Sequence, residues 1–284
     1  MTYDFIRERS SSPISTLCRV LGVSRSAYYH RQSHPMSAHQ EADIRLLGHI
    51  QTIHRASRGI YGSPRVHDAL RQEGIRCSRK RVARLMREHH LRAKTARRFR
   101  VTTRVGRSHQ ECVDLIQRRF DIGPLNRVWT SDITYLWTRQ GWVYLAVVLD
   151  LHSRRVIGWE LSARLTTDLV TGALHRALEM REVKPGLVLH SDRGSQYTSH
   201  EISLLVQEHG LRQSHGISCY DNAVTESFFH TLKTEHLQFE HFETRDQVRP
   251  SLFDYIELFY NRQRKHSTLG MLSPEQYETL NQLP

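Results

Sequence analysis

Residues 128–135 read VWTSDITY, and most of the expected fold follows from this run. It is rich in β-branched and aromatic residues and alternates in polarity, so it predicts a β-strand. Two more apolar runs follow at 142–149 (WVYLAVVL) and 155–161 (RVIGWEL), after short connections. Strands this close together form an antiparallel meander. The first of them carries a carboxylate, Asp132, among apolar and aromatic neighbours.

The residues after the meander alternate between helix and strand patterns. Helices are expected over 167–182, 200–209 and 224–235, and short strands over 187–190 and 211–214. The order βββαβαβα predicts an α/β domain. A longer helix is expected over about 246–260, and a basic tail follows it.

The residues before 125 predict two helix–turn–helix units. In the first, a helical pattern over 14–21 breaks at Gly22, and a second short helix follows. In the second, a helix over 63–73 ends at Gly74, and another begins after Ser78. A solvated amphipathic helix is the alternative interpretation of this last element. Its basic residues are the expected DNA contacts, namely Arg79, Lys80, Arg81, Arg84 and Arg87.

The charge of the 284-residue chain is segregated. Residues 1–120 contain 25 Lys and Arg against 9 Asp and Glu, whereas residues 121–284 contain 16 against 20. This division is typical of a polyanion-binding module joined to a domain that uses carboxylates. Of the 41 basic residues 36 are arginine, whose planar fork suits phosphate. A GC-rich genome would also produce an arginine excess, but it would not separate the charges.

These patterns predict five segments. They are a helix–turn–helix-like segment (1–35), a helix–turn–helix DNA-binding domain (40–95), a basic linker (96–124), a catalytic core (125–240), and a C-terminal helix with a basic tail (241–284). Residues 92–107 hold seven basic residues and no acidic one, which is typical of a linker that follows a nucleic-acid backbone.

Several classes of protein are excluded. No stretch approaches the roughly 18 apolar residues of a membrane span, and charges rather than an apolar segment follow the N-terminus, so no secretory signal is expected. No cysteine pair has CxxC spacing, which argues against a zinc knuckle and a disulfide framework. A reduced cytosolic protein is expected. The four cysteines are Cys18, Cys77, Cys112 and Cys219.

Three carboxylates are candidates for chemistry. Asp132 lies in the first strand, Asp192 follows the fourth strand, and Glu226 opens the last core helix. If the first and fourth strands are neighbours, these groups converge, and they repel one another unless they share a divalent cation. Ligands that are all oxygen suit Mg²⁺ or Mn²⁺. A pair of such ions promotes in-line phosphoryl transfer.

Each acidic residue also has a structural interpretation. A lone aspartate at a strand end is commonly a cap or an ion-pair partner. Asp150 is a competing carboxylate because it ends the second apolar strand. Since Arg154 and Arg155 follow it at the turn, we interpret Asp150 as a structural partner.

Five runs of residues together resemble a known family. They are WTSDITY (129–135), GWVYLAVVLD (141–150), HSDRGSQY (190–197), CYDNA (219–223) and ESFF (226–229). In this order they closely resemble the second-frame (OrfB) protein of IS3-family insertion-sequence transposases, within the DDE transposase and retroviral-integrase superfamily. The resemblance covers nearly the whole chain. It implies an α/β fold with a ribonuclease-H-like (integrase) catalytic core and an N-terminal all-α helix–turn–helix region.

The resemblance also implies a chemistry and partners. The family's catalytic and metal-binding triad falls on Asp132, Asp192 and Glu226, with Mg²⁺ (or Mn²⁺), two ions, as cofactor. The implied reaction releases a 3′-hydroxyl at the element's end, which then attacks another phosphodiester. The implied partners are double-stranded DNA (terminal inverted repeats and target), further copies in a synaptic complex, and the upstream-frame (OrfA) protein. Between Asp192 and Glu226 lie 33 residues, two fewer than usual, with the shortening at 214–218.

Further side chains are predicted to contact DNA. Asn222 and Lys233 share one helical face with Glu226, and Ser195 with Gln196 follows Asp192 closely enough to reach the scissile strand. The tail cluster is expected to follow the DNA backbone, and it consists of Arg262, Arg264, Lys265 and His266. For Lys233 and for the tail, a solvated charge is the alternative.

Two other functions remain open from the sequence. One is a DNA-binding accessory or regulatory protein that depends on the upstream-frame protein, because the chain shows no sustained heptad of its own. A ribonuclease H or junction-resolving nuclease would share the core, but it would not need the tandem basic helices.

Overall fold

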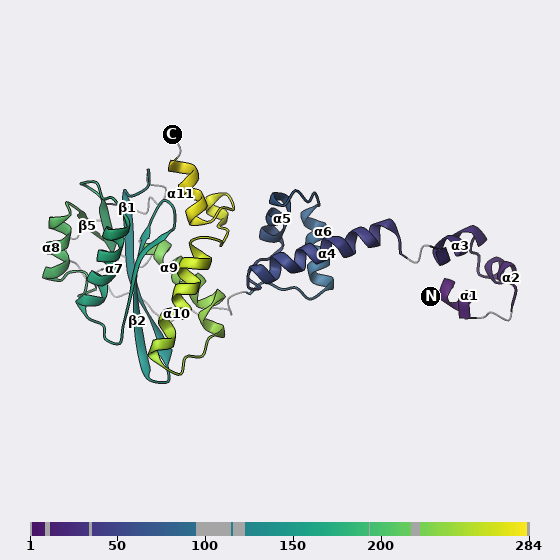
Figure 1. The fold of residues 1–284 in the computed structure, drawn as a ribbon, viewed down its shortest axis with the longest axis horizontal. Helices are drawn as coiled ribbons and strands as arrows, with labels where there is room; N and C mark the ends of the chain where they lie inside the picture. Colours follow the sequence, from purple (N-terminus) through teal and green to yellow (C-terminus); the bar gives the residue numbers. More distant parts are fainter. Residues whose placement is uncertain are drawn as a thin grey trace. The chain divides into compact units, whose positions relative to one another are not determined.

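The computed structural model describes residues 2–8, 12–33, 36–94, 115, 123–192, 194–216 and 222–282. The chain forms two compact units, residues 1–93 and residues 94–284, and each is described by itself. Most of the basic linker expected over 96–124 lies outside the described residues. Figure 1 shows the first unit built from helices alone and the second built around a sheet.

The first unit contains six helices among its described residues. They are α1 (Thr2–Glu8), α2 (Ile14–Val20), α3 (Arg25–Ser33), α4 (Ala38–Ala56), α5 (Ser63–Gln72) and α6 (Arg79–Glu88). The first three bury Ile6, Cys18 and Tyr28 together. Helices α4, α5 and α6 pack against one another. The helix pairs expected around Gly22 and Gly74 are therefore confirmed as helices.

The second unit contains a five-stranded sheet in the order β3-β2-β1-β4-β5. The strands are β1 (Val128–Thr138), β2 (Gly141–Asp150), β3 (Val156–Ser162), β4 (Val188–Ser191) and β5 (Arg212–His215). The first three are antiparallel, and β4 and β5 run parallel to β1. The expected meander, the order βββαβαβα, and the neighbouring positions of the first and fourth strands are all confirmed.

Helices cover the sheet. Helix α7 (Thr167–Met180) packs on β2 and β3, and α9 (Ala223–Glu235) packs on β1, on the other side of the sheet in Figure 1. Helix α8 (His200–Glu208) contacts α7 and β5. The approach of α7 to β3 requires glycine at 158, because an added Cβ there would lie 2.2 Å from the carbonyl oxygen of Ala173.

The C-terminal residues form more structure than the sequence predicts. The helix expected over about 246–260 comprises α10 (Val248–Phe253) and a π-helical stretch, η4 (Asp254–Tyr260). The rest is not a simple basic tail, because α11 (Pro274–Gln282) follows and its Glu278 accepts hydrogen bonds from Arg155 and Arg181. Short helical turns complete the region, namely η2 (Leu237–Phe239), η3 (Arg245–Gln247) and η5 (Ser267–Leu269).

Among the described helices, none combines the length and the apolar character needed to cross a membrane. Cys18 and Cys77 are free thiols, and the other two cysteines lie outside the described residues.

Candidate active site

The parallel pairing of β1 with β4 aligns two of the carboxylates. Three pairs connect the strands, and the last of them joins Thr130 to His190. Two residues further on, the same register brings Asp132 level with Asp192. Asp132 is half-buried and its Oδ1 accepts the N–H of Ile133 at 2.7 Å. The strands stop pairing where these carboxylates begin, so both acids lie at a sheet opening.

The loop after β4 holds the Asp192 carboxylate in a tight turn. Its Oδ1 accepts the N–H of Gly194 at 3.0 Å. A Cβ added at Gly194 would lie 3.1 Å from this oxygen and 3.3 Å from Oε1 of Gln196. Gln196 therefore lies near Asp192, as its place in the sequence suggested, while Ser195 is exposed.

Buried polar side chains attach the start of α9 to β1. The side-chain amide of Asn222 donates to the carbonyl oxygen of Ser131 at 2.9 Å. The Thr225 hydroxyl lies 2.8 Å from both the Thr130 hydroxyl and the amide oxygen of Asn222. All four residues are buried. Because Glu226 follows Thr225 directly, this network sets the distance between Glu226 and the strand that carries Asp132.

A second buried contact attaches the loop after Asp192 to the same strand. The Tyr197 hydroxyl lies 2.9 Å from Oγ of Ser131, and that oxygen donates to the carbonyl of Val147 at 2.8 Å. The carbonyl of Tyr197 accepts a hydrogen bond from Gln213 on β5 at 2.7 Å. Two strands thus hold the turn that presents Asp192.

The carboxylates act on one another electrostatically. The pKa of Asp132 is raised to about 7, mainly by burial of the carboxyl group. The negative charges of Asp192 and Glu226 act in the same direction. The Ile133 N–H and the Lys233 ammonium oppose the shift. Burial also raises the pKa of Glu226. Three acids therefore share one electrostatic environment, in which full ionisation needs a compensating positive charge.

The donor chemistry of this cluster fits a divalent cation. Carboxylate oxygens are the ligands that Mg²⁺ and Mn²⁺ prefer, and a cation would relieve the repulsion that raises the pKa of Asp132. Within the described residues, no three acidic, histidine or cysteine side chains form a preformed metal cage. The fit accordingly rests on the type and charge of the donors.

Lys233 lies beside the cluster, two turns along α9 from Glu226. Its side chain is exposed, and its Nζ is 5.5 Å from the centre of the Tyr135 ring. Partial burial lowers the pKa of Lys233, and the charge of Asp132 opposes that change. The ammonium group is thus positioned between the carboxylates and an exposed aromatic side chain.

Some of the other predicted DNA contacts are exposed, whereas others are buried. Asn222 is buried in the network described above. Arg264 is buried and donates to both oxygens of Glu235 at 2.7 and 2.6 Å. Lys265 is also buried, whereas Arg262 is exposed. The expected basic tail cluster is therefore not a single surface in this conformation.

The helix α6 shows the same separation. Arg79, Lys80 and Arg87 are exposed. Arg81 and Arg84 each donate to the Asp43 carboxylate on α4 at 2.6 Å. Two of the five basic residues therefore fix the helix to its neighbour, and three remain on the surface.

Asp150 is a structural residue, as the sequence suggested, but its partners differ from those expected. It is fully buried, and its carboxylate accepts backbone N–H groups of Asn126, His152 and Ser153 at 2.8 to 3.0 Å. Its role is to close the turn after β2. Arg155, in contrast, pairs with Glu278 of α11.

Sequence reasoning missed the residues that position the acids, namely Thr130, Ser131, Tyr197 and Thr225. Hydroxyl groups in an otherwise apolar strand were the available signal, because buried hydroxyls need partners. Residues 219–221 and 217–218, in the run before Glu226 and in the shortened loop, lie outside the described residues, as does Arg193.

Comparisons with known proteins agree with this architecture. Residues 125–219 and 226–281 match two family models described as "Integrase core domain", and residues 41–99 match an "HTH-like domain" model. The transposase InsF for insertion sequence IS3A of Escherichia coli (strain K12) is 40% identical over 286 residues, which covers 99% of each chain. The insertion element IS600 uncharacterized 31 kDa protein of Shigella sonnei is 40% identical over 260 residues, or 91% of this chain and 96% of that one.

Two integrase catalytic core domains are among the solved structures that the chain matches. The catalytic core domain of BIV integrase has 21% sequence identity and a TM-score of 0.41, over 55% of this chain and 95% of that one. The HTLV-2 integrase catalytic core domain in complex with magnesium (trimeric form) has 15% identity and a TM-score of 0.42, over 54% and 96%.

An integrase core joined to a helix–turn–helix-like region defines the class, a DDE transposase that acts on DNA. Within that class, the chain belongs to the IS3 family of insertion-sequence transposases. The resemblance inferred from the sequence motifs is thereby confirmed, together with the α/β fold class.

Proposed function

We propose that this chain catalyses divalent-metal-dependent DNA cleavage at the 3′ ends of its element and the subsequent strand transfer. Asp132, Asp192 and Glu226 are the proposed metal-binding and catalytic residues. The observation that carries this proposal is the register of β1 and β4, which aligns the two aspartates beside the start of α9. The raised pKa of Asp132 supports it, because closely spaced carboxylates need a cation to ionise together.

The proposed division of labour follows from the geometry. Bound Mg²⁺ or Mn²⁺, two ions in the proposal, would polarise a water or hydroxyl and neutralise charge on the leaving oxygen. Lys233 is placed to orient a phosphate of the scissile strand, since its ammonium lies between Asp132 and Tyr135. Gln196, next to the Asp192 turn, is placed to donate to the same strand.

The helical unit would supply end recognition. Helix α6 presents Arg79, Lys80 and Arg87 to solvent, which suits contacts in a major groove and to its flanking phosphates. Exposed Arg262 is a further candidate for a backbone contact. Pairing two element ends requires at least two copies of the chain, and the upstream-frame protein is the proposed additional partner. The domain limits proposed from the sequence remain 1–35, 40–95, 96–124, 125–240 and 241–284.

Strand cleavage and joining on a labelled element-end duplex tests the proposal. Wild-type protein with Mg²⁺ is compared with Glu226→Gln, with and without the upstream-frame protein. Glu201→Gln is the matched control, because Glu201 is an exposed acid in the first turn of another core helix, α8. We expect joining by wild type and by the control, and none by Glu226→Gln or after metal chelation. DNA binding without chemistry in every mixture would instead identify an accessory protein.

A further inference from the structure

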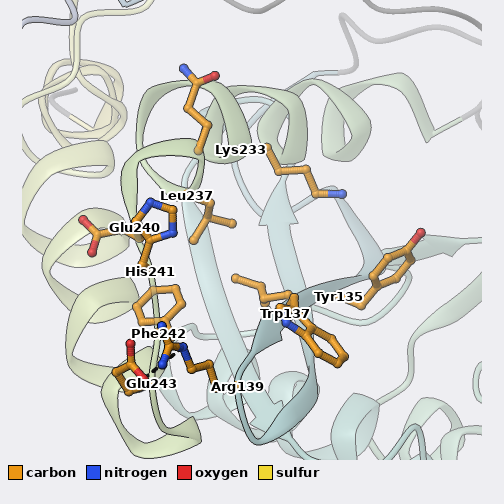
Figure 2. Close-up of a pocket in the computed structure, with 11 residues that line it drawn as sticks. Tyr135, Trp137, Arg139, Lys233, Leu237, Glu240, His241, Phe242 and Glu243 are labelled. Carbon is orange, nitrogen blue, oxygen red and sulfur yellow. Dashed lines mark ion pairs between the residues drawn. The ribbon is translucent and has the colours of Figure 1, made fainter.

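Beyond the carboxylates, the side of β1 opposite β2 has no paired strand among the described residues. Strand β4 pairs only with residues 128–130, whereas β1 extends to Thr138. Beside this edge lies an open groove of about 590 Å³, bounded on its other side by the segment 237–243 after α9. Figure 2 shows Lys233 at one end of the groove and the Arg139–Glu243 ion pair at the other. The groove therefore runs from Lys233, beside the candidate active site, to the tip of the β1–β2 hairpin.

Large aromatic side chains are exposed along this groove. Trp137 and Tyr135 line it and are 59% and 58% exposed, and the adjacent Trp142 is 45% exposed. Exposed aromatics grouped in this way mark an interaction site more often than a random surface does. Trp142 contacts both of the others edge-on, with ring centres 5.1 Å from Tyr135 and 4.8 Å from Trp137. The rings thus have fixed partners before any ligand arrives.

The hairpin that carries these rings is held at its tip. The N–H of Arg139 donates to the carbonyl of Phe242 at 3.1 Å, and the N–H of Arg245 donates to Oε1 of Gln140 at 3.0 Å. A platform anchored in this way loses little conformational freedom when a ligand stacks on it.

The charges in the groove favour bases over phosphates. Arg139 pairs with Glu243 at 3.1 Å, so the far end is balanced in charge. Lys233, at the near end, faces the ring of Tyr135. A nucleic-acid strand would therefore place a phosphate near Lys233 and its bases against the aromatic side chains. Base stacking on such side chains is tolerant of sequence and requires unpaired nucleotides.

We propose that this groove, lined by Tyr135 and Trp137, binds a single-stranded segment of the DNA whose phosphodiester occupies the carboxylate site. Asp132 and Trp137 are five residues apart on one strand, or about 17 Å, and this odd separation places their side chains on opposite faces of the sheet, so the DNA strand would cross the free edge of β1 between them. This distance is the rise of about five base steps. The unpaired bases that stack on Trp137 then lie within about five nucleotides of the scissile phosphate. The inference rests on the proposed function for its DNA substrate.

The test measures the affinity of the full chain for an oligothymidylate of about eight nucleotides. Binding is detected by the quenching of tryptophan fluorescence. Two of the four tryptophans, Trp137 and Trp142, are exposed and report on the groove, whereas Trp129 and Trp159 are buried. Trp137→Ala and the apolar Trp137→Leu are compared with Phe253→Ala. Phe253 is the matched control because it is a half-exposed aromatic residue on α10 that does not line the groove.

We expect both Trp137 variants to bind oligothymidylate about 5- to 100-fold more weakly than wild type, because each loses the stacking of one base. The control should bind as wild type does. Equal affinity of wild type and Trp137→Leu would overturn the proposal. A second result would also overturn it: Trp137→Leu is monomeric where wild type self-associates, and its affinity for oligothymidylate is unchanged. The aromatic patch would then be a contact between copies of the chain.

A second arm separates this inference from the proposed function. Glu226→Gln should keep the wild-type affinity for oligothymidylate while losing strand joining. Joining by Trp137→Leu should be slowed on fully paired ends and partly restored on ends that carry mismatches next to the cleavage site. Absence of metal-dependent joining by wild type would refute the proposed function. Weaker binding of oligothymidylate by the Trp137 variants would still support the groove as a site for single-stranded DNA.

Discussion

Replacing Thr225 with valine removes one hydroxyl and little volume from the network that joins α9 to β1. That hydroxyl lies 2.8 Å from Thr130 and 2.8 Å from Asn222, and Thr225 itself is fully buried. Two buried polar groups lose a partner, and each costs about 1–3 kcal/mol when it is left unsatisfied. We expect the free energy of unfolding to fall by about 2–6 kcal/mol in total. For a unit of this size, that corresponds to a decrease in Tm of roughly 4–24 °C.

The same substitution tests whether the network positions Glu226. A displacement of about 1 Å at a reacting group can reduce the rate about 100-fold, so strand joining should fall by about 10- to 100-fold while the affinity for an element-end duplex stays unchanged. Thr225→Ser keeps the hydroxyl and should retain joining. Thr171→Val is the control for a threonine-to-valine change in a core helix, because its hydroxyl only approaches a carbonyl of its own helix at 3.3 Å.

Tm is measured by circular dichroism, and joining is measured on labelled element ends. Equal loss of joining in Thr225→Val and Thr225→Ser would refute the reasoning, because the hydroxyl would then not be the relevant group. Wild-type joining and Tm in Thr225→Val would refute it as well.

Three further predictions concern positions outside this network. Arg264→Ala should reduce the free energy of unfolding by about 3–5 kcal/mol in urea titration, because it leaves Glu235 buried without its guanidinium partner. The control Arg262→Ala should leave the free energy of unfolding unchanged. Equal effects of the two substitutions would contradict a structural role specific to Arg264. Arg84 and Arg81 on α6 hold the pKa of Asp43 below its usual value, so their ion pairs with Asp43 stabilise the fold above the unfolded-state pKa, and this contribution is lost as the pH falls through the lowered pKa. Melting temperatures of wild type and Asp43→Asn should therefore converge at low pH. A difference that stays constant with pH would contradict this prediction. Gly158→Ala should destabilise the core by about 1–3 kcal/mol or more in urea titration, because its Cβ would meet the α7 backbone at 2.2 Å, and a wild-type transition would show that α7 moves freely.

The sequence predicted the positions of the acids better than the environment of the basic residues. Asp132 and Asp192 are detectable because a charge within an apolar strand or just after one is unusual, and strand order then brings them together. Arg264 lies in a run that reads as a solvated basic tail, yet it is buried against Glu235, 29 residues earlier in the chain. Such a partner depends on tertiary packing, which local composition does not encode.

The same limit applies to helix faces and helix starts. Periodicity placed Asn222 and Glu226 on one side of α9. It does not say which residues on that side are buried. Asn222 donates a hydrogen bond to β1 rather than facing solvent. In contrast, α11 had a local signal. The Ser273–Pro274 pair repeats the Ser63–Pro64 pair at the start of α5, and proline is typical of the first turn of a helix, so α11 could have been predicted in place of a tail.

The early end of β4 has two consequences for function. Because β4 pairs with β1 over three residues only, the two aspartates lie where the strands separate. The same separation exposes the edge of β1 on which Tyr135 and Trp137 lie. If β4 continued beside β1, the added strand would fill the groove and cover the space next to Asp132. The candidate active site and the proposed single-strand groove are therefore two parts of one opening in the sheet, and a DNA strand that enters at the carboxylates would reach the aromatic rings by crossing the free edge of β1.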